Sequence, residues 1–107
     1  MSIQFKNNAS TTLASAINNV TTTITVAAGG GANLPALAAS EYFYATIVDI
    51  DDNFEIVKVT ARSTDTLTVV RAQEGTTARS FVSGSRLENR ITAQSLRDAT
   101  TGDYLLL

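Results

Sequence analysis

The run FEIVKVTARSTDTLTVVRAQEGTTAR, residues 54–79, constrains the fold more than any other stretch of the chain. Its first part alternates apolar and polar residues, and its β-branched side chains suit the pleated surface of a sheet. We predict strands over residues 54–62 and 66–71. Residues 63–65 are predicted to form the turn between them, because their side chains can hydrogen-bond their own backbone. Residues 73–78 lack an apolar period and are predicted to be a loop.

Other segments alternate in the same way. Residues 42–49 are apolar on both faces, which is typical of a strand that is central in a sheet or covered by another subunit. Alternation over residues 20–26 and 86–91 predicts strands that bury every second side chain, including those of Val20 and Ile91. Two shorter strands are predicted over residues 1–6 and 11–17.

The rest of the chain carries turn and helix signals. Glycines 29–31 are not expected inside a regular element, because each glycine loses much backbone entropy on folding. Thr92 is a suitable N-cap for a short helix over residues 93–98 that would bury Leu96. The sequence therefore predicts an all-β fold, a small antiparallel β-sandwich or partly closed barrel of about six to eight short strands with one short C-terminal helix.

The chain of 107 residues is long enough for one hydrophobic core and too short for two, so we predict a single domain over residues 1–107. Residues 1–19 are expected to form an arm or edge strands, and residues 99–107 a tail at an interface. The tail ends in an apolar run that either packs on its own domain or inserts into a neighbouring chain. That run is Tyr104, Leu105, Leu106 and Leu107.

Cysteine and histidine, which carry much of enzyme chemistry, do not occur in the chain. Their absence removes disulfides, thiolate ligands and thiol nucleophiles, together with the most common general base and metal ligand. We therefore predict no enzymatic activity, no metal site and no cofactor. A net charge of −2 gives no electrostatic case for binding nucleic acid or an anionic membrane, and no stretch is apolar enough to span a bilayer.

Three polar clusters suggest sites, and each has a plainer interpretation. Acids alternate along residues 49–55 as in a calcium loop, but the required sixth and twelfth positions do not fit, which favours a solvated turn. Glycines 29–31 lack the helix start and nearby lysine of a phosphate-binding loop. Glu74 lies among arginines without a complete acid–base set, which favours a loop residue that pairs with an arginine or with backbone N–H groups.

Charge is distributed unevenly along the chain. Residues 41–55 contain five acids and no base, whereas residues 58–97 contain seven bases and three acids. This division would either give a surface dipole that orients subunits, or form exposed cross-strand ion pairs worth under about 1 kcal/mol each. The second interpretation is favoured, because opposite charges on neighbouring strands are common.

The run EIVKVTARSTDTLTVVRAQEGTTARSF, with Gly84, RLE and ITAQSL after it, resembles a small β domain of tail-associated proteins of tailed bacteriophages, including minor tail and fibre proteins. The upstream ANLPALAASEYFYATIVD is similar too, so the resemblance covers residues 20–97. Its most specific part is the hairpin that leads into RAQEGTTA. The family offers no catalytic residues to carry over, and the resemblance implies a structural role in the virion.

The expected function is that of a virion structural protein, assembled in the bacterial host cytoplasm, as a tail-associated adaptor or fibre-attachment component. Its expected partners are other virion proteins and further copies of itself, with no nucleic acid and no membrane. The alternatives are a capsid decoration protein and a carbohydrate-binding receptor module that uses tyrosines as apolar platforms. The docking surface is expected to include an exposed face of the 42–49 strand. The predicted interface residues are Tyr42, Tyr44, Gln73, Glu74, Thr76 and the apolar tail of residues 104–107.

Overall fold

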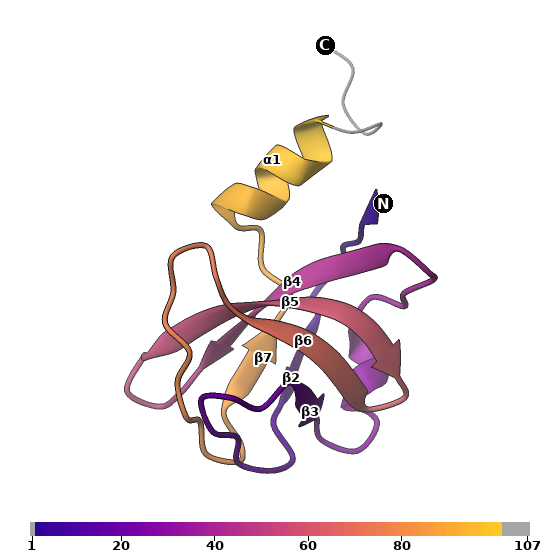
Figure 1. Cartoon of the computed structure of the whole chain (residues 1–107). Coiled ribbons are helices and arrows are strands. Elements are labelled where there is room, and N and C mark those ends of the chain that lie inside the picture. The colour runs from indigo at the N-terminus through magenta and orange to yellow at the C-terminus, as the bar shows by residue number, and fades with distance from the viewer. Residues whose placement is uncertain (1, 102–107) are drawn as a thin grey trace.

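A computed structural model describes residues 2–101, and its main feature is a curved, mostly antiparallel β-sheet with a helix at one end (Figure 1). Six strands are hydrogen-bonded in the order β2-β7-β4-β5-β6-β3, and β1 pairs in parallel with β4. The prediction of a mostly antiparallel β fold with one short C-terminal helix is confirmed. The elements are β1 (Ser2–Ile3), β2 (Ser10–Thr12), β3 (Thr23–Thr25), the 3-10 helix η1 (Gly30–Asn33), β4 (Glu41–Val48), β5 (Phe54–Ser63), β6 (Thr66–Gln73), β7 (Arg86–Glu88) and α1 (Ala93–Thr101).

Strands β4, β5 and β6 form the centre of the sheet and confirm the predicted hairpin. β5 pairs antiparallel with β4 on one side and with β6 on the other. Thr64 and Asp65 connect β5 to β6, and Thr64 has a positive φ of 56°. Two bulges interrupt the pairing of β5 with β6, and Ala72, in one of them, has a φ of 55°. Bulges bend a strand and increase its twist, which helps this sheet to curve.

The inner face of the curved sheet holds the main hydrophobic core. Phe43, Ala45 and Ile47 alternate along β4 and are buried there, as are Val57 and Val59 of β5. Burying one large apolar side chain of this kind stabilises the fold by about 1.5–3 kcal/mol. The remaining core residues are Ala9, Leu13, Ile17, Ile24, Val26, Leu34, Leu67, Val69, Phe81 and Leu87.

The two edge strands, β2 and β3, approach each other where the sheet curls over this core. Leu13, directly after β2, forms an isolated antiparallel bridge with Val26, directly after β3. The two backbone hydrogen bonds that flank the bridge measure 2.8 and 2.9 Å. The sheet is therefore a half-barrel whose edges meet at this bridge.

The predicted strand over residues 20–26 is too long. Only Thr23–Thr25 forms β3, and the Val20 side chain is 72% exposed rather than buried. Asn18 explains the difference, because its Oδ1 accepts the Val20 N–H at 2.9 Å and the Thr21 hydroxyl at 2.8 Å. An asparagine that hydrogen-bonds the backbone two residues ahead favours a turn over a strand.

The predicted strand over residues 86–91 also ends early. β7 stops at Glu88, and the Ile91 side chain is 74% exposed instead of buried. Asn89 departs from the strand because its side-chain amide donates to the Tyr44 carbonyl at 2.8 Å, while its N–H donates to the Ala9 carbonyl at 3.0 Å. These contacts lead the chain away from the sheet before Ile91.

The glycine run lies in an element that the sequence did not predict. Gly30 and Gly31 are buried in η1, and a Cβ added to Gly31 would lie 1.8 Å from the Thr64 carbonyl oxygen. A Cβ on Gly30 would lie 2.0 Å from Thr11 Oγ1. Glycine therefore allows η1 to pack directly against the β5–β6 turn and β2, which outweighs its entropic cost.

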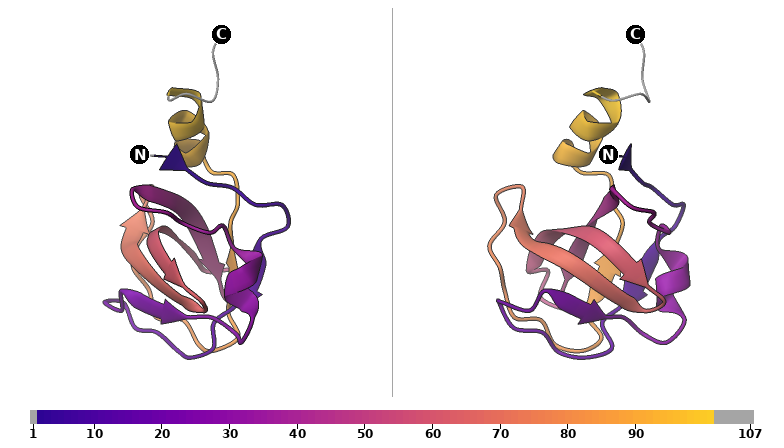
Figure 2. Two further views of the ribbon diagram at one scale, coloured as in Figure 1. Left: turned by 90° about the vertical axis from the view of Figure 1, so that its right-hand side faces the viewer. Right: turned by 45° about the vertical axis from the view of Figure 1, so that its right-hand side comes forward.

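Helix α1 lies outside the half-barrel, above β1 and the start of β4 (Figures 1 and 2). Ser95, Asp98 and Ala99 form its inward face, since residues three and four apart share one side of a helix. Leu96 falls on another side and is 56% exposed, so the predicted burial of Leu96 is wrong.

Candidate interaction surface

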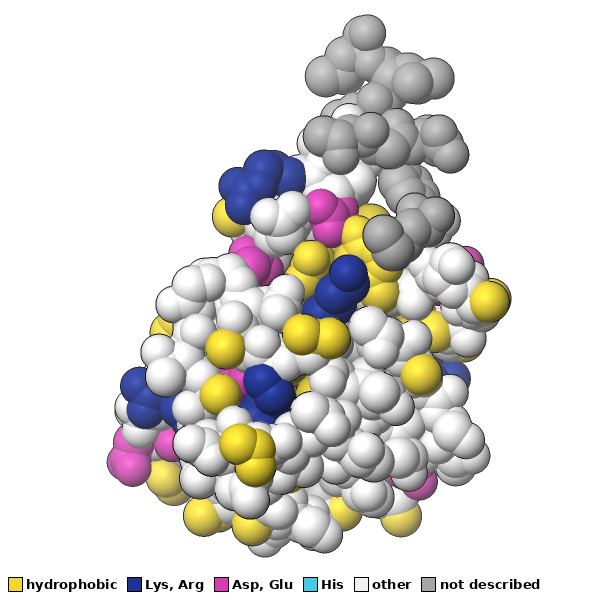
Figure 3. Space-filling model, viewed as in Figure 1, with side chains coloured by type: hydrophobic (Ala, Val, Ile, Leu, Met, Phe, Trp, Pro, Cys, Tyr) yellow, Lys and Arg dark blue, Asp and Glu magenta, His cyan; other side chains and the backbone are white. Residues whose placement is uncertain are grey.

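Two tyrosines from the predicted interface lie on the outer face of the sheet, beneath α1. Tyr42 and Tyr44 are 7% and 6% exposed, and they form a second hydrophobic cluster with Ile3. Ile56 and Ala99 pack against this cluster, and Figure 3 shows hydrophobic side chains gathered where α1 meets the sheet. The expectation that this strand face is exposed is therefore wrong at Tyr42 and Tyr44, because the chain covers it with its own helix and first strand.

The carboxylate of Asp98 joins α1 to these tyrosines. Its Oδ2 accepts the Tyr42 hydroxyl at 2.5 Å and the Tyr44 hydroxyl at 3.4 Å, and its Oδ1 accepts the Gln94 side-chain amide at 2.7 Å. The two tyrosine rings meet edge to face with centroids 5.7 Å apart, and Lys58 Nζ lies 4.4 Å from the centre of the Tyr42 ring. The cluster therefore combines a carboxylate, two phenols and an ammonium group beside an apolar patch.

The pKa values in this cluster follow from its geometry. Burial alone would raise the pKa of Asp98, but hydrogen bonds from Tyr42, Gln94 and Tyr44 outweigh it and hold the pKa below its usual range. Burial, then the Asp98 charge, raise the pKa of Tyr44. At neutral pH Asp98 is thus an acceptor and both phenols are donors, which is the arrangement that the hydrogen bonds require.

Glu74 holds the other end of α1. Its Oε1 accepts the Gln94 N–H at 3.0 Å, and its Oε2 accepts the Thr92 hydroxyl at 2.5 Å. Thr92 and Ser95 cap the helix reciprocally: the Ser95 N–H donates to Thr92 Oγ1 at 3.2 Å, and the Thr92 N–H donates to Ser95 Oγ at 2.7 Å. Two predictions are confirmed, the N-cap at Thr92 and the pairing of Glu74 with a backbone N–H group.

Gln73 and Thr76 fix the loop that carries Glu74. The Gln73 side-chain amide donates to the Arg71 carbonyl at 3.1 Å. Thr76 Oγ1 accepts the Ile56 N–H at 3.1 Å and donates to the Gln73 carbonyl at 2.7 Å. Both side chains are half-buried and hydrogen-bonded within the chain, so they position Glu74 against α1.

Glu55 and Arg71 form a buried ion pair at the opposite side of the same loop. Arg71 Nε and Nη2 each lie 2.8 Å from a Glu55 oxygen, and the two side chains are 7% and 0% exposed. Arg71 also donates to the carbonyls of Asn18, Thr21 and Arg79. This pair differs from the exposed cross-strand pairs expected from the charge pattern, because it is buried and ties two loops to the sheet.

Backbone donors complete the environment of Glu55. The N–H groups of Ala72 and Arg79 each donate to its carboxylate at 2.9 Å. Burial would raise the pKa of Glu55, but the hydrogen bonds from Arg71, Ala72 and Arg79 outweigh it and keep the pKa below its usual value. Within the described residues, every buried side-chain nitrogen and oxygen has a hydrogen-bond partner.

In the two remaining candidate sites from the sequence, an aspartate carboxylate of the chain itself accepts the backbone N–H groups. Asp49 Oδ1 accepts the N–H groups of Asp51 and Asn53, both at 2.9 Å, so this carboxylate closes the turn that resembled a calcium loop. Asp65 accepts the N–H groups of Gly31 at 2.8 Å and Gly29 at 3.1 Å, so the glycine turn already holds an anionic group. Among residues 2–101, no group of three or more acids is arranged to hold a metal ion.

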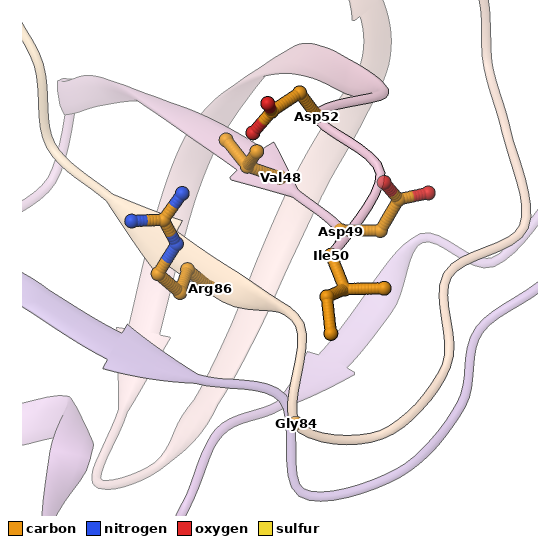
Figure 4. A pocket seen from close by; sticks show the side chains of 6 residues that line it. All are labelled: Val48, Asp49, Ile50, Asp52, Gly84 and Arg86. Carbon is orange, nitrogen blue, oxygen red and sulfur yellow. The ribbon is translucent and has the colours of Figure 1, made fainter.

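A pocket of about 350 Å³ lies between the β4–β5 turn and the turn before β7 (Figure 4). Val48 and Ile50 supply its apolar lining, and Ile50 is 95% exposed. Two acids, Asp49 and Asp52, and one base, Arg86, line the pocket, so its lining carries charges of both signs. Asp49 and Gly84 complete the wall.

The structure brings together part of the predicted interface. Tyr42, Tyr44 and Glu74 all contact α1 or its N-cap, and Gln73 and Thr76 support them, whereas residues 104–107 lie outside the described residues. Sequence reasoning missed Glu55 and Asp98. The sequence did contain a signal for Asp98. Ser95, Asp98 and Ala99 are spaced three and four residues apart, so they form a stripe of small and polar side chains on one side of the helix, away from its single leucine.

Comparison of the sequence with models of known protein families gives no match, and comparison with curated proteins gives none either. In the part of the chain that the structure describes, no helix has the length and apolar character needed to cross a membrane.

Proposed function

We propose that the chain is a structural protein of a tailed-bacteriophage virion. It acts as a tail-associated adaptor or fibre-attachment component, through contacts with other virion proteins and with further copies of itself. It is assembled in the host cytoplasm and works without catalysis, cofactor, nucleic acid or membrane.

The observation that carries this proposal is how the segments with the phage resemblance are joined. The hairpin continues directly into the RAQEGTTA loop, the ITAQSL segment follows further along the chain, and two carboxylates hold the three parts together. Glu55 of the hairpin binds Arg71, and Glu74 of the loop binds the N-terminus of α1. Residues of the resembling motif thus hold a terminal helix against a sheet, which suits a protein that presents a defined surface to its neighbours.

The half-barrel favours one of the two predicted architectures. We propose a partly closed barrel rather than a sandwich, because the Leu13–Val26 bridge joins the two edge strands of one continuous sheet. A closed edge leaves few unpaired backbone groups for uncontrolled association, so assembly would depend on side-chain surfaces and on α1.

The carbohydrate-binding alternative could rest on Tyr42, Tyr44 or Tyr104; burial of Tyr42 and Tyr44 disfavours it, and Tyr104 lies outside the described residues. A sugar platform needs an accessible aromatic face, and Tyr42 and Tyr44 lie beneath α1. The capsid-decoration alternative shares the proposed chemistry of protein contacts and differs in the number of copies per particle.

Copy number separates these functions. Quantitative mass spectrometry of purified virions should find this chain far below the major capsid subunit, at a small multiple of the tail symmetry. A count close to that of the capsid subunit would replace the tail proposal with decoration. Absence from virions that contain every other structural protein would overturn a virion role altogether.

A further inference from the structure

We infer that α1 exchanges between two copies of the chain, so that the helix of one copy docks on the Tyr42–Tyr44 face of the other. This inference specifies one of the subunit contacts on which the proposed function rests. The partner is a second copy of this chain, and the site is the face now covered by α1.

The contacts of α1 show which helix fits this face. Asp98 accepts both tyrosine hydroxyls, Ala99 packs on the apolar cluster, and Gln94 meets Glu74. A second copy presents an identical helix, so every one of these contacts forms again after exchange. Exchange of an identical element is a low-cost route to a dimer for this reason.

α1 contributes few apolar side chains of its own to this contact, and its release uncovers Tyr42 and Tyr44 until a second helix covers them again. Of its hydrophobic residues, Ala99 packs against the tyrosine cluster, while the larger Leu96 is 56% exposed. The other attachments are the hydrogen bonds of Asp98 with the two tyrosines and those of Glu74 with the helix N-terminus, for which water can substitute once the helix leaves. The main core beneath β4 lies on the opposite face of the sheet and stays intact.

The hinge for exchange is short and defined. Asn89 is fixed to the barrel by hydrogen bonds with Lys6, Ala9 and Tyr44, and Thr92 belongs to the helix cap. Residues 90–91 lie between these anchors, and both are exposed. Two extended residues span only about 7 Å, so the two barrels of an exchanged dimer must lie close together.

Exposed apolar side chains sit where the two copies would then meet. Ile91 in the hinge is 74% exposed, and Leu96 on the outward side of α1 is 56% exposed. In an exchanged dimer the two hinges pass each other around a two-fold axis, and these side chains contact the partner. This added burial, absent from the monomer, favours the dimer at high concentration.

The absence of cysteine from the chain permits a direct trap. An Ile3→Cys variant and an Ala99→Cys variant are mixed at high concentration, diluted and treated with a short bis-maleimide. Ile3 belongs to the cluster beneath α1 and Ala99 is the residue of α1 that packs against it, so docking of the helix of one copy on the other brings the two cysteines together. The matched control replaces Ala99→Cys with Leu96→Cys, which lies on the same helix but on its exposed side.

We expect heterodimer from the Ala99→Cys mixture well above that from the Leu96→Cys mixture. Light scattering of the unmodified chain provides a measurement that needs no variant, and should show a rise from 11.3 kDa toward twice that mass with concentration. Three residues of Gly and Ser inserted between positions 90 and 91 should shift the mass toward the monomer, because a short hinge favours exchange and a longer one keeps the docking of α1 on its own barrel while reducing that bias.

Equal adduct in both mixtures, together with a monomer mass at every concentration, would overturn the exchange. That result would leave the virion role to be decided by copy number. Conversely, absence of the chain from virions would overturn the proposed function and leave a trapped dimer standing.

Discussion

Two carboxylates organise this small protein, and they do so in different ways. Glu55 is fully buried, binds Arg71 with both oxygens and accepts two backbone N–H groups. Asp98 is half-buried at the edge of α1 and accepts two phenols and an amide from residues of its own helix and of β4. Glu55 ties loops to the sheet, whereas Asp98 ties a helix to it.

The difference lies in what each group leaves behind when its contacts break. Breaking the contacts of Glu55 would leave the buried guanidinium of Arg71 without its carboxylate partner, which is strongly unfavourable. Opening the Asp98 cluster exposes a carboxylate and two phenols to water, which can hydrogen-bond all of them. The barrel should therefore behave as one cooperative unit, with α1 as a separately releasable element.

The largest expected effect comes from Glu55→Gln. Loss of the charge leaves Arg71 buried without its partner, and we expect a fall of about 3–5 kcal/mol in the free energy of unfolding, measured by urea denaturation. Glu88→Gln is the matched control, because Glu88 pairs with Arg90 at 2.6 Å on the surface and should change stability by less than about 1 kcal/mol. Similar small losses in both variants would remove the contrast between the two carboxylates.

Gly31→Ala tests whether the barrel end is as tightly fitted as the close approach of η1 implies. The new Cβ would meet the Thr64 carbonyl oxygen, a backbone atom that cannot move alone. Overpacking of this kind costs about 1–3 kcal/mol, to be measured as a lower urea midpoint with an unchanged slope. An unchanged midpoint would show that η1 can shift away from the β5–β6 turn.

Asp98→Asn should release α1 with little effect on the barrel. The half-exposed position places the loss at about 1 kcal/mol, so trypsin cleavage after Arg97 should accelerate several-fold while the unfolding midpoint of β5 and β6 barely changes. Asp51→Asn is a suitable control, since Asp51 lies in the exposed β4–β5 turn away from α1. Equal cleavage rates for both variants would show that Asp98 does not hold the helix.

Low pH should have the smallest effect on the difference in stability between α1 and the barrel. The pKa of Asp98 is lowered in the folded protein, so its contribution is present above the unfolded pKa and is lost as pH falls through the folded value. We expect the amide resonances of α1 to report release below about pH 4. Asp98→Asn should remove this pH dependence, and a profile unchanged by that substitution would assign it to another group.

The sequence predicted the hairpin well, because alternation and turn chemistry are local. The β5–β6 hairpin and the Thr92 cap followed from residues adjacent in the chain, whereas the partner of Glu74, the N–H of Gln94, lies twenty residues away and was predicted only as an arginine or a backbone N–H group. The Glu55–Arg71 pair was missed. Alternation places Glu55 on the buried face of β5 with Val57 and Val59, and Arg71 follows Leu67 and Val69 on β6, but the bulge that includes Ala72 shifts the register between these strands, and no local pattern reveals that shift.

The candidate surface was predicted only in part for a related reason. Tyr42, Tyr44 and Glu74 were selected, but their partner within the chain was not. α1 docks through Ser95, Asp98 and Ala99, which carry little apolar signal, whereas the one leucine of the helix points elsewhere. A helix held by polar contacts is difficult to orient from hydrophobic periodicity alone.

Native-state hydrogen exchange of the whole chain tests most directly whether α1 opens separately from the barrel. In low concentrations of urea, the amides of α1 should exchange through a local opening with little urea dependence, while those of β5 and β6 exchange only by global unfolding. If α1 exchanges with the same free energy and the same urea dependence as β5 and β6, the helix is part of the cooperative barrel and the account of a releasable element is wrong.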